Sequence, residues 1–439
     1  MRKVLAFLLT GLVLYGVYWF AATRLFDEGS YRKQVAFGSV FVPYGWAYAL
    51  GFLLLLVLLV LLYSVGYTAL TNRLQGRRRS PWPLFLQGIT HLFLWVLILL
   101  VYYPVVQVVA ASFDPTNNLF SFRRPDTGFL ILDAKVIPYL PQPSLENYAK
   151  LVEGVILYPY QLGLLLLAGL ALLGVGGIGL MRRLLPEEDW MGFWQGRLLL
   201  LMALSVFALA LTLSPDQFTG QGTETKFLLW VRNTFLISGL TGLLAVLLTA
   251  TAGYAFARFR HLPGRYPLLL FFIFVQMFPG FLALVAIYYL LSWLNLLNTF
   301  TGLVLAYSGG IISFGTWVYK GYLESISPSL EEAAMVDGAT KWQVFTKILL
   351  PLSAPMFVFI FLLQFVGTYS EFVLANLVLT GVESWNVGVG LRSFTTGQFQ
   401  TKWGIFAAAS VLGSLPILFL FYGFQQYFVS GYTAGAVKE

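Results

Sequence analysis

Long apolar stretches alternate with short polar connections along the whole chain. Ten stretches of about 20 residues carry almost no charge, and a helix of this length crosses the hydrocarbon core of a bilayer. The pattern therefore predicts an all-α polytopic membrane protein. The expected helices lie near residues 4–22, 45–65, 88–112, 157–181, 192–214, 228–257, 266–290, 301–322, 352–370 and 404–428.

Three polar connections are longer than a membrane topology requires. Residues 113–155 are rich in Pro, Asn, Asp and Arg, and we expect them to form an external loop that folds as a small cap. Residues 323–350 connect two spans on the cytoplasmic side and show the pattern of an amphipathic helix. Residues 371–403 are rich in Gly and Thr, which favours an external loop partly inserted at the membrane edge.

The distribution of charge gives the expected orientation. Met1-Arg2-Lys3 places the N-terminus in the cytoplasm by the positive-inside rule. A cleaved signal peptide ending near Ala21-Ala22 is an alternative, although the apolar run exceeds the usual 7–15 residues. With this topology, sixteen basic and eight acidic residues are cytoplasmic, and eleven of each are external. The net charge of +8 thus reflects topology, and 77–79 reads as an anchor against anionic lipid, with no nucleic-acid partner.

Composition excludes several classes of protein. A content of 58% hydrophobic and 10% charged residues is incompatible with a water-soluble fold. The absence of cysteine and the presence of only His91 and His261 exclude a disulfide framework, a Cys/His metal cluster and a His-dependent triad. No P-loop pattern occurs, so this chain does not itself hold ATP in that manner. We read His91 as a hydrogen-bond partner between helices, with a proton relay as the alternative.

Two features within the spans are candidates for a transport route. Glu371 ends the ninth span beside Tyr369, and an ionisable residue at membrane depth is by default functional. The alternative is that Glu371 lies in the interface as an ordinary cap. Pro279-Gly280 lies in the middle of the seventh span, where proline removes a backbone hydrogen bond and kinks the helix. A broken helix at mid-membrane is typical of a translocation pathway, although kinks without function also occur.

The most specific pattern is in the cytoplasmic segment 327–351. Glu331 and Glu332 fall in the first turn of a predicted helix, where the helix dipole favours negative charge. Ala333-Ala334 lacks bulk, so another surface can approach closely, and Asp337-Gly338 ends the helix. A second short helix then follows, with an apolar stripe of Trp342, Phe345 and Ile348-Leu349, and we expect Pro351 to open the next span. The segment predicts a helix–turn–helix suited to docking in a partner's groove, with a simple surface connector as the alternative.

The same residues carry a family resemblance. Glu332-Ala333-Ala334, Asp337-Gly338-Ala339, Phe345, Ile348 and Leu350-Pro351 resemble the E-A-A motif of importer-type ABC permeases. The resemblance extends over about 227–439 and includes 230–234 and 253–260. Residues 294–299 and 370–372 are similar to the carbohydrate branch, with Tyr369-Ser370 in place of the usual Trp-Asn pair. The tail 431–438 resembles that of the G-type maltose/maltodextrin permease subunits.

The resemblance implies a six-helix permease core with about four accessory transmembrane helices. The accessory helices form two added segments, and each contains an even number of spans, so the E-A-A segment stays cytoplasmic. The expected domains are two accessory N-terminal helices over 1–87, the first core helix and external loop over 88–154, an inserted helical hairpin over 155–226, and the permease core over 227–439.

The resemblance also implies a function and a set of partners. The chain would be a permease subunit of an ATP-driven sugar importer, with maltose or maltodextrin favoured over trehalose, sucrose or another oligosaccharide. Its partners would be a second (F-type) permease subunit, two cytoplasmic ATPase subunits that bind ATP and Mg, and an extracytoplasmic sugar-binding protein. This chain would hold no cofactor, would catalyse no reaction and would form half the pore in the bacterial inner membrane.

Site roles follow by the same resemblance. The ATPase-coupling residues would be Glu332, Ala333, Ala334, Asp337, Gly338, Ala339, Phe345 and Pro351. Glu371, Pro279, Gly280 and Tyr369 would line the route. The glycines of the external loop (Gly388, Gly390 and Gly397) would form tight turns against the binding protein, or would only let the loop fold back on the membrane surface. Two other classes stay open. A membrane enzyme for lipid-linked sugars needs an external carboxylate cluster, and an ion-coupled secondary transporter needs intramembrane acids; the E-A-A segment argues against both.

Overall fold

The fold is described from a computed structural model of the chain. The described residues are 11–12, 45–76, 79–116, 142–184, 189–220, 223–259, 261, 263–396 and 401–436. Within these ranges the ordered elements are helices, apart from one isolated antiparallel bridge between Val155 and Phe218. The expected all-α fold is confirmed. The chain divides into two compact units, 1–147 with 402–408 and 148–401 with 409–439.

The first unit contains a pair of long helices, α3 (Gly45–Gln75) and α4 (Trp82–Ser112). They pack closely at Gly88, where a β carbon would lie 2.4 Å from Val60 Cγ1. Their connection is closed by Asn72, whose side chain donates to the carbonyl of Arg79 (3.0 Å) and accepts from its N–H (2.9 Å). At the other end of α4, Asn147 at the start of α6 (Glu146–Val152) donates to the carbonyls of Ser112 and Asp114.

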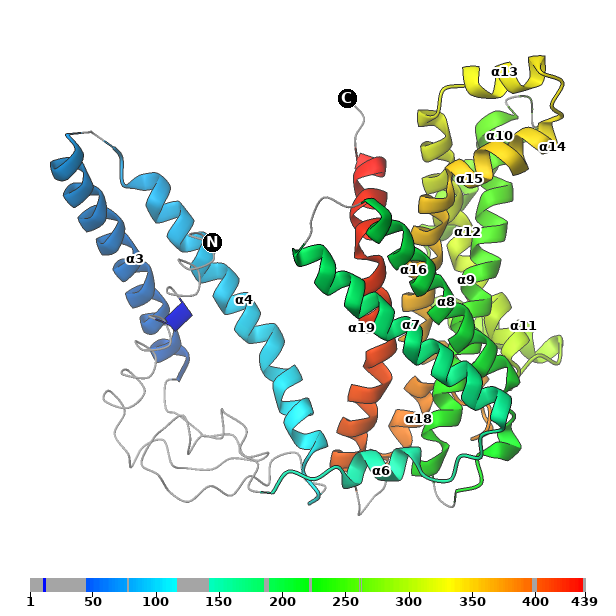
Figure 1. Cartoon of the computed structure of the whole chain (residues 1–439), viewed down its shortest axis with the longest axis horizontal. Helices are drawn as coiled ribbons and strands as arrows, with labels where there is room; N and C mark the ends of the chain where they lie inside the picture. Colours follow the sequence, from blue (N-terminus) through cyan, green and yellow to red (C-terminus); the bar gives the residue numbers. More distant parts are fainter. Residues whose placement is uncertain are drawn as a thin grey trace. The chain divides into compact units, whose positions relative to one another are not determined.

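The centre of the second unit is formed by α9 (Phe227–Arg258), α12 (Phe300–Ser325) and α16 (Ala354–Tyr369), which lie side by side in Figure 1. Small residues bring these helices together, as is usual where helices pack inside a membrane. A β carbon at Gly253 of α9 would lie 2.6 Å from the Tyr319 ring of α12, and one at Gly242 would lie 2.7 Å from the Phe361 ring of α16. The buried core of the unit is therefore built around α9.

A helical hairpin, α7 (Pro159–Leu184) and α8 (Asp189–Thr212), packs against α9. The Phe207 ring fills the space above Gly239, where a β carbon would lie 2.6 Å away. Buried amide side chains connect the start of α7 to the end of α8. Gln161 donates to the carbonyl of Thr212, and Gln161 and Gln217 each donate to the other. Two 3₁₀ turns, Pro215–Gln217 and Glu224–Lys226, lead into α9.

The seventh expected span is broken into α10 (Arg265–Met277) and α11 (Gly280–Trp293). The two helices are bent by 103°. Pro279 at the break has extended backbone angles (φ −60°, ψ 118°) and has no N–H to continue the hydrogen-bond ladder. The predicted kink is confirmed, and it is a complete break in the helix.

Short helices occupy the two connections that follow α12 and α16. At one end of the unit are α13 (Ser329–Val336), α14 (Lys341–Val344), a π turn (Phe345–Leu349) and α15 (Leu350–Leu352). The predicted external loop contains α17 (Val373–Val378) and α18 (Val387–Ser393), and α19 (Trp403–Ala436) ends the described chain.

Nine of the ten expected spans correspond to helices of the described chain. In the described ranges, seven helices are long and apolar enough to cross a membrane, and the count becomes nine when each of two bent helix pairs is taken as one span. The remaining window, 4–22, lies outside the described residues except for Gly11 and Leu12. The chain is therefore a multi-pass membrane protein.

Candidate functional site

The segment from α13 to α15 crosses one end of the second unit (Figure 1). The turn that follows α13 is closed by two hydrogen bonds, from the N–H of Gly338 to the carbonyl of Met335 (3.1 Å) and from the N–H of Ala339 to that of Ala334 (2.9 Å). This is a Schellman motif, which requires a left-handed residue, and Gly338 has φ +88°. The predicted break at Asp337-Gly338 is confirmed.

The second helix begins with a capping box. Thr340 Oγ1 accepts from the N–H of Gln343 (3.3 Å), and Gln343 Oε1 accepts from the N–H of Thr340 (2.8 Å). A threonine followed three residues later by glutamine is a sequence signal for a helix start. Sequence analysis missed this signal at Thr340, although it was available.

The segment has an outward face and an inward face. The outward face comprises Glu332, Ala333, Asp337 and Gly338, all exposed, together with Met335 and Val336. Ala334 and Ala339 are half-buried against the core, and Phe345 and Leu349 are buried in it. Of the predicted apolar stripe, Phe345 and Leu349 are buried and Ile348 is half-buried. Trp342 is 69% exposed and contacts Phe345, with ring centroids 5.8 Å apart.

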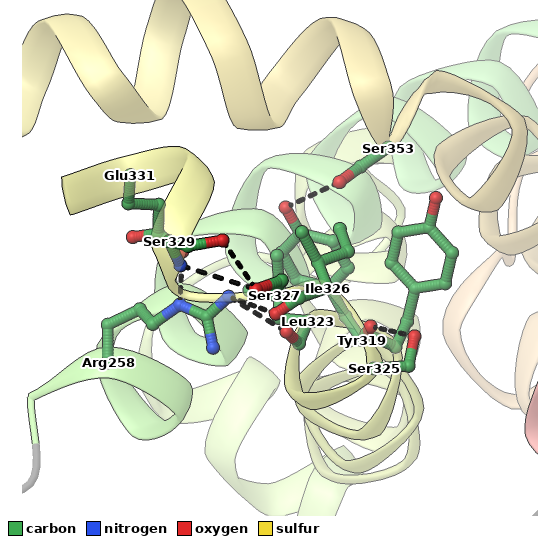
Figure 2. Close-up of polar contacts among 10 residues, drawn as sticks. Arg258, Tyr319, Leu323, Ser325, Ile326, Ser327, Ser329, Glu331 and Ser353 are labelled. Carbon is green, nitrogen blue, oxygen red and sulfur yellow. Dashed lines mark hydrogen bonds and ion pairs between the residues drawn. The ribbon is translucent and has the colours of Figure 1, made fainter. Parts of the chain in front are cut away.

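An ion pair fixes the inward face of α13. Arg258, in the last turn of α9, contacts Glu331 with Nε 2.5 Å from Oε1 (Figure 2). The same guanidinium donates through Nη2 to the carbonyls of Leu323 (2.8 Å) and Ile326 (3.3 Å) at the end of α12. Sequence analysis gave Glu331 only a helix-dipole role, and the pair escaped it because 73 residues separate the partners.

Aromatic contacts support the second half of the segment. The Tyr254 ring of α9 stacks on Phe345 with centroids 4.5 Å apart. Tyr319 donates from its hydroxyl to Ser353 Oγ at 3.1 Å, as Figure 2 shows, and Tyr322 donates to the carbonyl of Leu352. The segment is thus attached to both α9 and α12.

Pro351 lies in α15, just ahead of a bend in the chain. The helix axis bends by 70° between Lys341–Leu352 and Ala354–Tyr369, so the long helix α16 begins after Ser353. Pro351 and Pro355 flank the bend, and each lacks the N–H that a continuous helix requires. Pro351 is therefore in the last short helix of the segment from α13 to α15, and α16 follows directly after the bend.

At the opposite end of the unit, Glu371 has three hydrogen-bond donors. It accepts from the hydroxyl of Tyr307 on α12 and from the N–H groups of Leu374 (2.8 Å) and Ala375 (3.1 Å) in the first turn of α17. The carboxylate therefore caps α17 and ties it to α12. Both readings of Glu371, a residue of the transport route and an interfacial cap, stay predictions.

The other proposed route residues occupy different environments. The Tyr369 ring is 4% exposed and packs edge-on against Phe235 of α9, so it belongs to the packing of the unit. Its hydroxyl is buried and has no hydrogen-bond partner in the described part of the chain. Pro279 and Gly280 are exposed at the break between α10 and α11.

Gly388 and Gly390 do not form the tight turns expected of them. Gly388 and Gly390 lie in α18 and neither has a left-handed φ. A β carbon at Gly390 would lie 2.0 Å from the Trp230 ring, so this glycine permits close packing of α18 on α9. The same residue type serves turns and close contacts, which explains the error. Gly397 lies outside the described residues.

The first turns of α9 hold the outer loop in place. Trp230 Nε1 donates to the carbonyl of Val382 (2.9 Å), and Asn233 Nδ2 donates to those of Glu383 (2.7 Å) and Trp385 (2.9 Å). Thr234 Oγ1 accepts from the N–H of Val387 at 2.8 Å. The motif 230–234, which the sequence offered only as a resemblance, is therefore an anchor for residues 382–387.

An open pocket of about 450 Å³ lies beside this anchor. Its walls come from separate segments of the second unit: Pro215, Arg232, Asn298, Phe300 and 381–384. Asn298, with φ +58°, accepts from the N–H groups of Thr380 and Gly381 and so joins the α11–α12 connection to the outer loop. No group of three or more His, Cys, Asp or Glu side chains suited to a metal occurs in the described ranges.

Comparisons with known proteins decide the family. The model of the binding-protein-dependent transport system inner membrane component family matches residues 245–433. The maltose/maltodextrin transport system permease protein MalG of Salmonella typhimurium is 43% identical over 238 residues, which are 52% of this chain and 79% of that protein. MalG of Vibrio vulnificus is 43% identical over 244 residues, 54% of this chain and 81% of that protein. The chain belongs to this family.

It is therefore a permease subunit of an ABC importer and a transport component. The fold agrees with this assignment, since a bacterial ABC transporter involved in the import of the acidic polysaccharide alginate aligns with a TM-score of 0.53 and 16% identity. That alignment covers 80% of this chain and 99% of the other. At this identity the likeness concerns the fold alone. Residues 332–351, which carry the E-A-A resemblance, fall inside the matched region.

Proposed function

We propose that this chain is the G-type permease subunit of an ATP-driven importer for maltose or a maltodextrin. It forms half of a pore with a second, F-type permease subunit, surrounded by membrane lipids. Two ATPase subunits bind and hydrolyse ATP with Mg, and a sugar-binding protein delivers the sugar from outside. The permease converts closure of the ATPases into alternating access to the sugar.

One observation carries this proposal. The short helix α13 and its C-cap expose Glu332, Ala333 and Asp337. On the other side of the helix, Glu331 pairs with Arg258 of α9. A helix that is fixed from behind and exposes the small Ala333 beside Glu332 is well shaped to enter a groove of a partner. Glu332 is exposed and is suited to pair with an Arg or Lys of an ATPase subunit.

Orientation follows from the same assignment. We place α13 in the cytoplasm, in accordance with the excess of basic residues in the segments on that side. The N- and C-termini are then cytoplasmic, and residues 371–403 are external. In this orientation the outer loop and the open pocket face the sugar-binding protein.

The choice of sugar rests on the relatives. Two permeases named for maltose and maltodextrin transport share 43% of their residues with this chain over about four fifths of their length. Residues 1–87 and 155–226 precede the matched family region, and we propose that they are accessory transmembrane segments added to the six-helix core. In the described structure the hairpin α7–α8 packs on α9, which supports a role in bracing the core.

Reconstitution of the complex tests the proposal. The chain is expressed with candidate F-type permease and ATPase subunits, purified as a complex, and placed in proteoliposomes with the binding protein. ATP-dependent uptake of labelled maltose is expected, with weaker uptake of trehalose and sucrose.

Glu332→Gln supplies the matched variant. Loss of one member of a desolvated charge pair typically costs about 2–5 kcal/mol, so this variant should lose the ATPase from the complex. Glu153→Gln removes an exposed carboxylate at the far end of the unit and should retain it. Equal ATPase retention by Glu332→Gln and the wild type would contradict the docking assignment, and uptake without ATP would contradict the proposed function.

A further inference from the structure

Arg258 joins three separate elements of the second unit. It lies in the last turn of α9, its Nε contacts Glu331 of α13, and its Nη2 donates to carbonyls at the end of α12 (Figure 2). The side chains of Arg258 and Glu331 are only 16% and 10% exposed. A charge pair at such low exposure is screened little by water, so its geometry is well defined.

Little else holds α13 at this position. Ser327 and Pro328 are all that separate Ile326, at the end of α12, from α13, and the Gly338 turn connects it to α14. Within the described residues, Glu331 makes the only polar side-chain contact between α13 and a transmembrane helix. Without that contact, α13 would keep the packing of Ala334 on the core and its contacts with α14, and it would lose its ion pair with α9.

The helix that carries Arg258 also carries the outer-loop anchor. Trp230, Asn233 and Thr234 bind residues 382–387 near the start of α9, and Arg258 ends the same helix. A helix of 32 residues is roughly 48 Å long at 1.5 Å per residue. One continuous element therefore connects α13 to the outer loop.

We propose that α9 is a coupling rod, meaning a single helix that transmits movement from one of its ends to the other. In this proposal Arg258 is the positioning residue that attaches α13, the docking helix, to α9. Displacement of α13 is delivered through Glu331 and Arg258 to α9 and α12 together, and α9 carries it to residues 382–387. Because coupling between two sites is reciprocal, a protein that binds the outer loop acts on α13 through the same rod. This inference rests on the proposed function, in which α13 receives an ATPase and the outer loop receives the binding protein.

The test uses the whole complex and three variants. Arg258→Met removes all three contacts of the guanidinium, and Glu331→Gln removes the charge while keeping the shape. Arg265→Met is the matched control, because Arg265 also binds the last turn of α9, through the carbonyl of Phe256, and pairs with Glu324 of α12. Among the described residues it makes no polar contact with α13. Binding-protein-stimulated ATP hydrolysis and sugar uptake per ATP are measured for each.

We expect the first two variants to keep the ATPase bound but to lose roughly fivefold or more in stimulation and in sugar moved per ATP. Combined in one chain, they should be no worse than Arg258→Met alone, since Arg258→Met already breaks the contact with Glu331. Asn233→Ala should lower stimulation from the outer end of the rod. Wild-type coupling in Arg258→Met, or an equal loss in Arg265→Met, would overturn the proposal.

A second measurement does not depend on transport. The chain has no cysteine, so Ala333→Cys gives a single thiol on the exposed face of α13 for a spin label. The label should be restrained in the otherwise unchanged chain and in Arg265→Met, and mobile in Arg258→Met and Glu331→Gln. An equally restrained label in all variants would overturn the role of Arg258. If the unmodified complex neither binds an ATPase nor imports sugar, the proposed function fails, whatever the label shows.

Discussion

Replacement of Gly338 by aspartate tests whether this residue serves only the turn after α13 or also the surface that docks on an ATPase subunit. Gly338 has φ +88°, where a residue with a β carbon costs roughly 1–2 kcal/mol. No heavy atom lies within 4 Å of the position that a β carbon would occupy, so steric clash within the chain adds nothing. A cost of this size changes the population of the native turn by a factor of about 5–30. The effect inside the subunit is therefore limited to backbone strain.

Gly264 provides a control with the same backbone cost. It precedes α10 at the same end of the unit, has φ +75°, and has only Leu268 Cδ1 near its β-carbon position, at 3.9 Å. Gly338→Asp and Gly264→Asp should insert in similar amounts, as measured by immunoblot of membranes. Gly338→Asp alone should lose ATPase association and sugar-stimulated hydrolysis, because it adds bulk and charge to the outward face of the docking segment.

The comparison has a clear negative outcome. If Gly338→Asp lowers only the amount of inserted subunit and the remainder transports at the normal specific rate, Gly338 serves the local turn and the coupling assignment is wrong. An equal loss of ATPase association in Gly264→Asp would also contradict the coupling assignment, because backbone strain at this end of the unit would then be enough to release the ATPase.

Three further changes test the outer end. Glu371→Gln should lower the stability of the solubilised subunit by about 1–3 kcal/mol in thermal denaturation, because the carboxylate accepts from Tyr307 and from two N–H groups of α17. If the same variant leaves transport and binding-protein-stimulated hydrolysis unchanged, Glu371 does not belong to the sugar route. Gly390→Ala should cost about 1–3 kcal/mol by overpacking against Trp230, whereas Gly280→Ala, with open space around it, should be neutral in the same melt. Shortening residues 371–403 should abolish stimulation by the binding protein and leave the complex assembled, and lost assembly would favour a structural role for this loop.

The sequence predicted features that depend on neighbouring residues. Apolar windows located nine spans because burial in lipid requires about 20 apolar residues in succession. Asp337-Gly338 predicted the end of α13 because a left-handed turn depends on the residue that occupies it. The break at Pro279 was predicted for the same local reason, and its angle of 103° was not, because the packing of other helices sets the angle.

Features that depend on distant residues were missed or misread. Nothing in the pattern around Arg258 or Glu331 shows that they meet, since the pair forms only when α9 and α12 bring the two segments together. Gly390 was read as a turn residue, and its purpose is visible only with the Trp230 ring beside it. The bend of 70° between Leu352 and Ala354, just after Pro351, was not predicted either.

Cross-linking from Ala333 tests the central claim, that α13 docks on an ATPase subunit, most directly. Ala333→Cys is the only thiol in its chain, and Glu153→Cys at the opposite end of the unit is the control. In the purified complex, a short thiol-reactive cross-linker should join position 333 to an ATPase subunit and should join position 153 to none. Glu332→Gln in the same chain should reduce the product. Absence of the product at position 333 in a complex that still imports sugar, or an equal yield from position 153, would contradict the account.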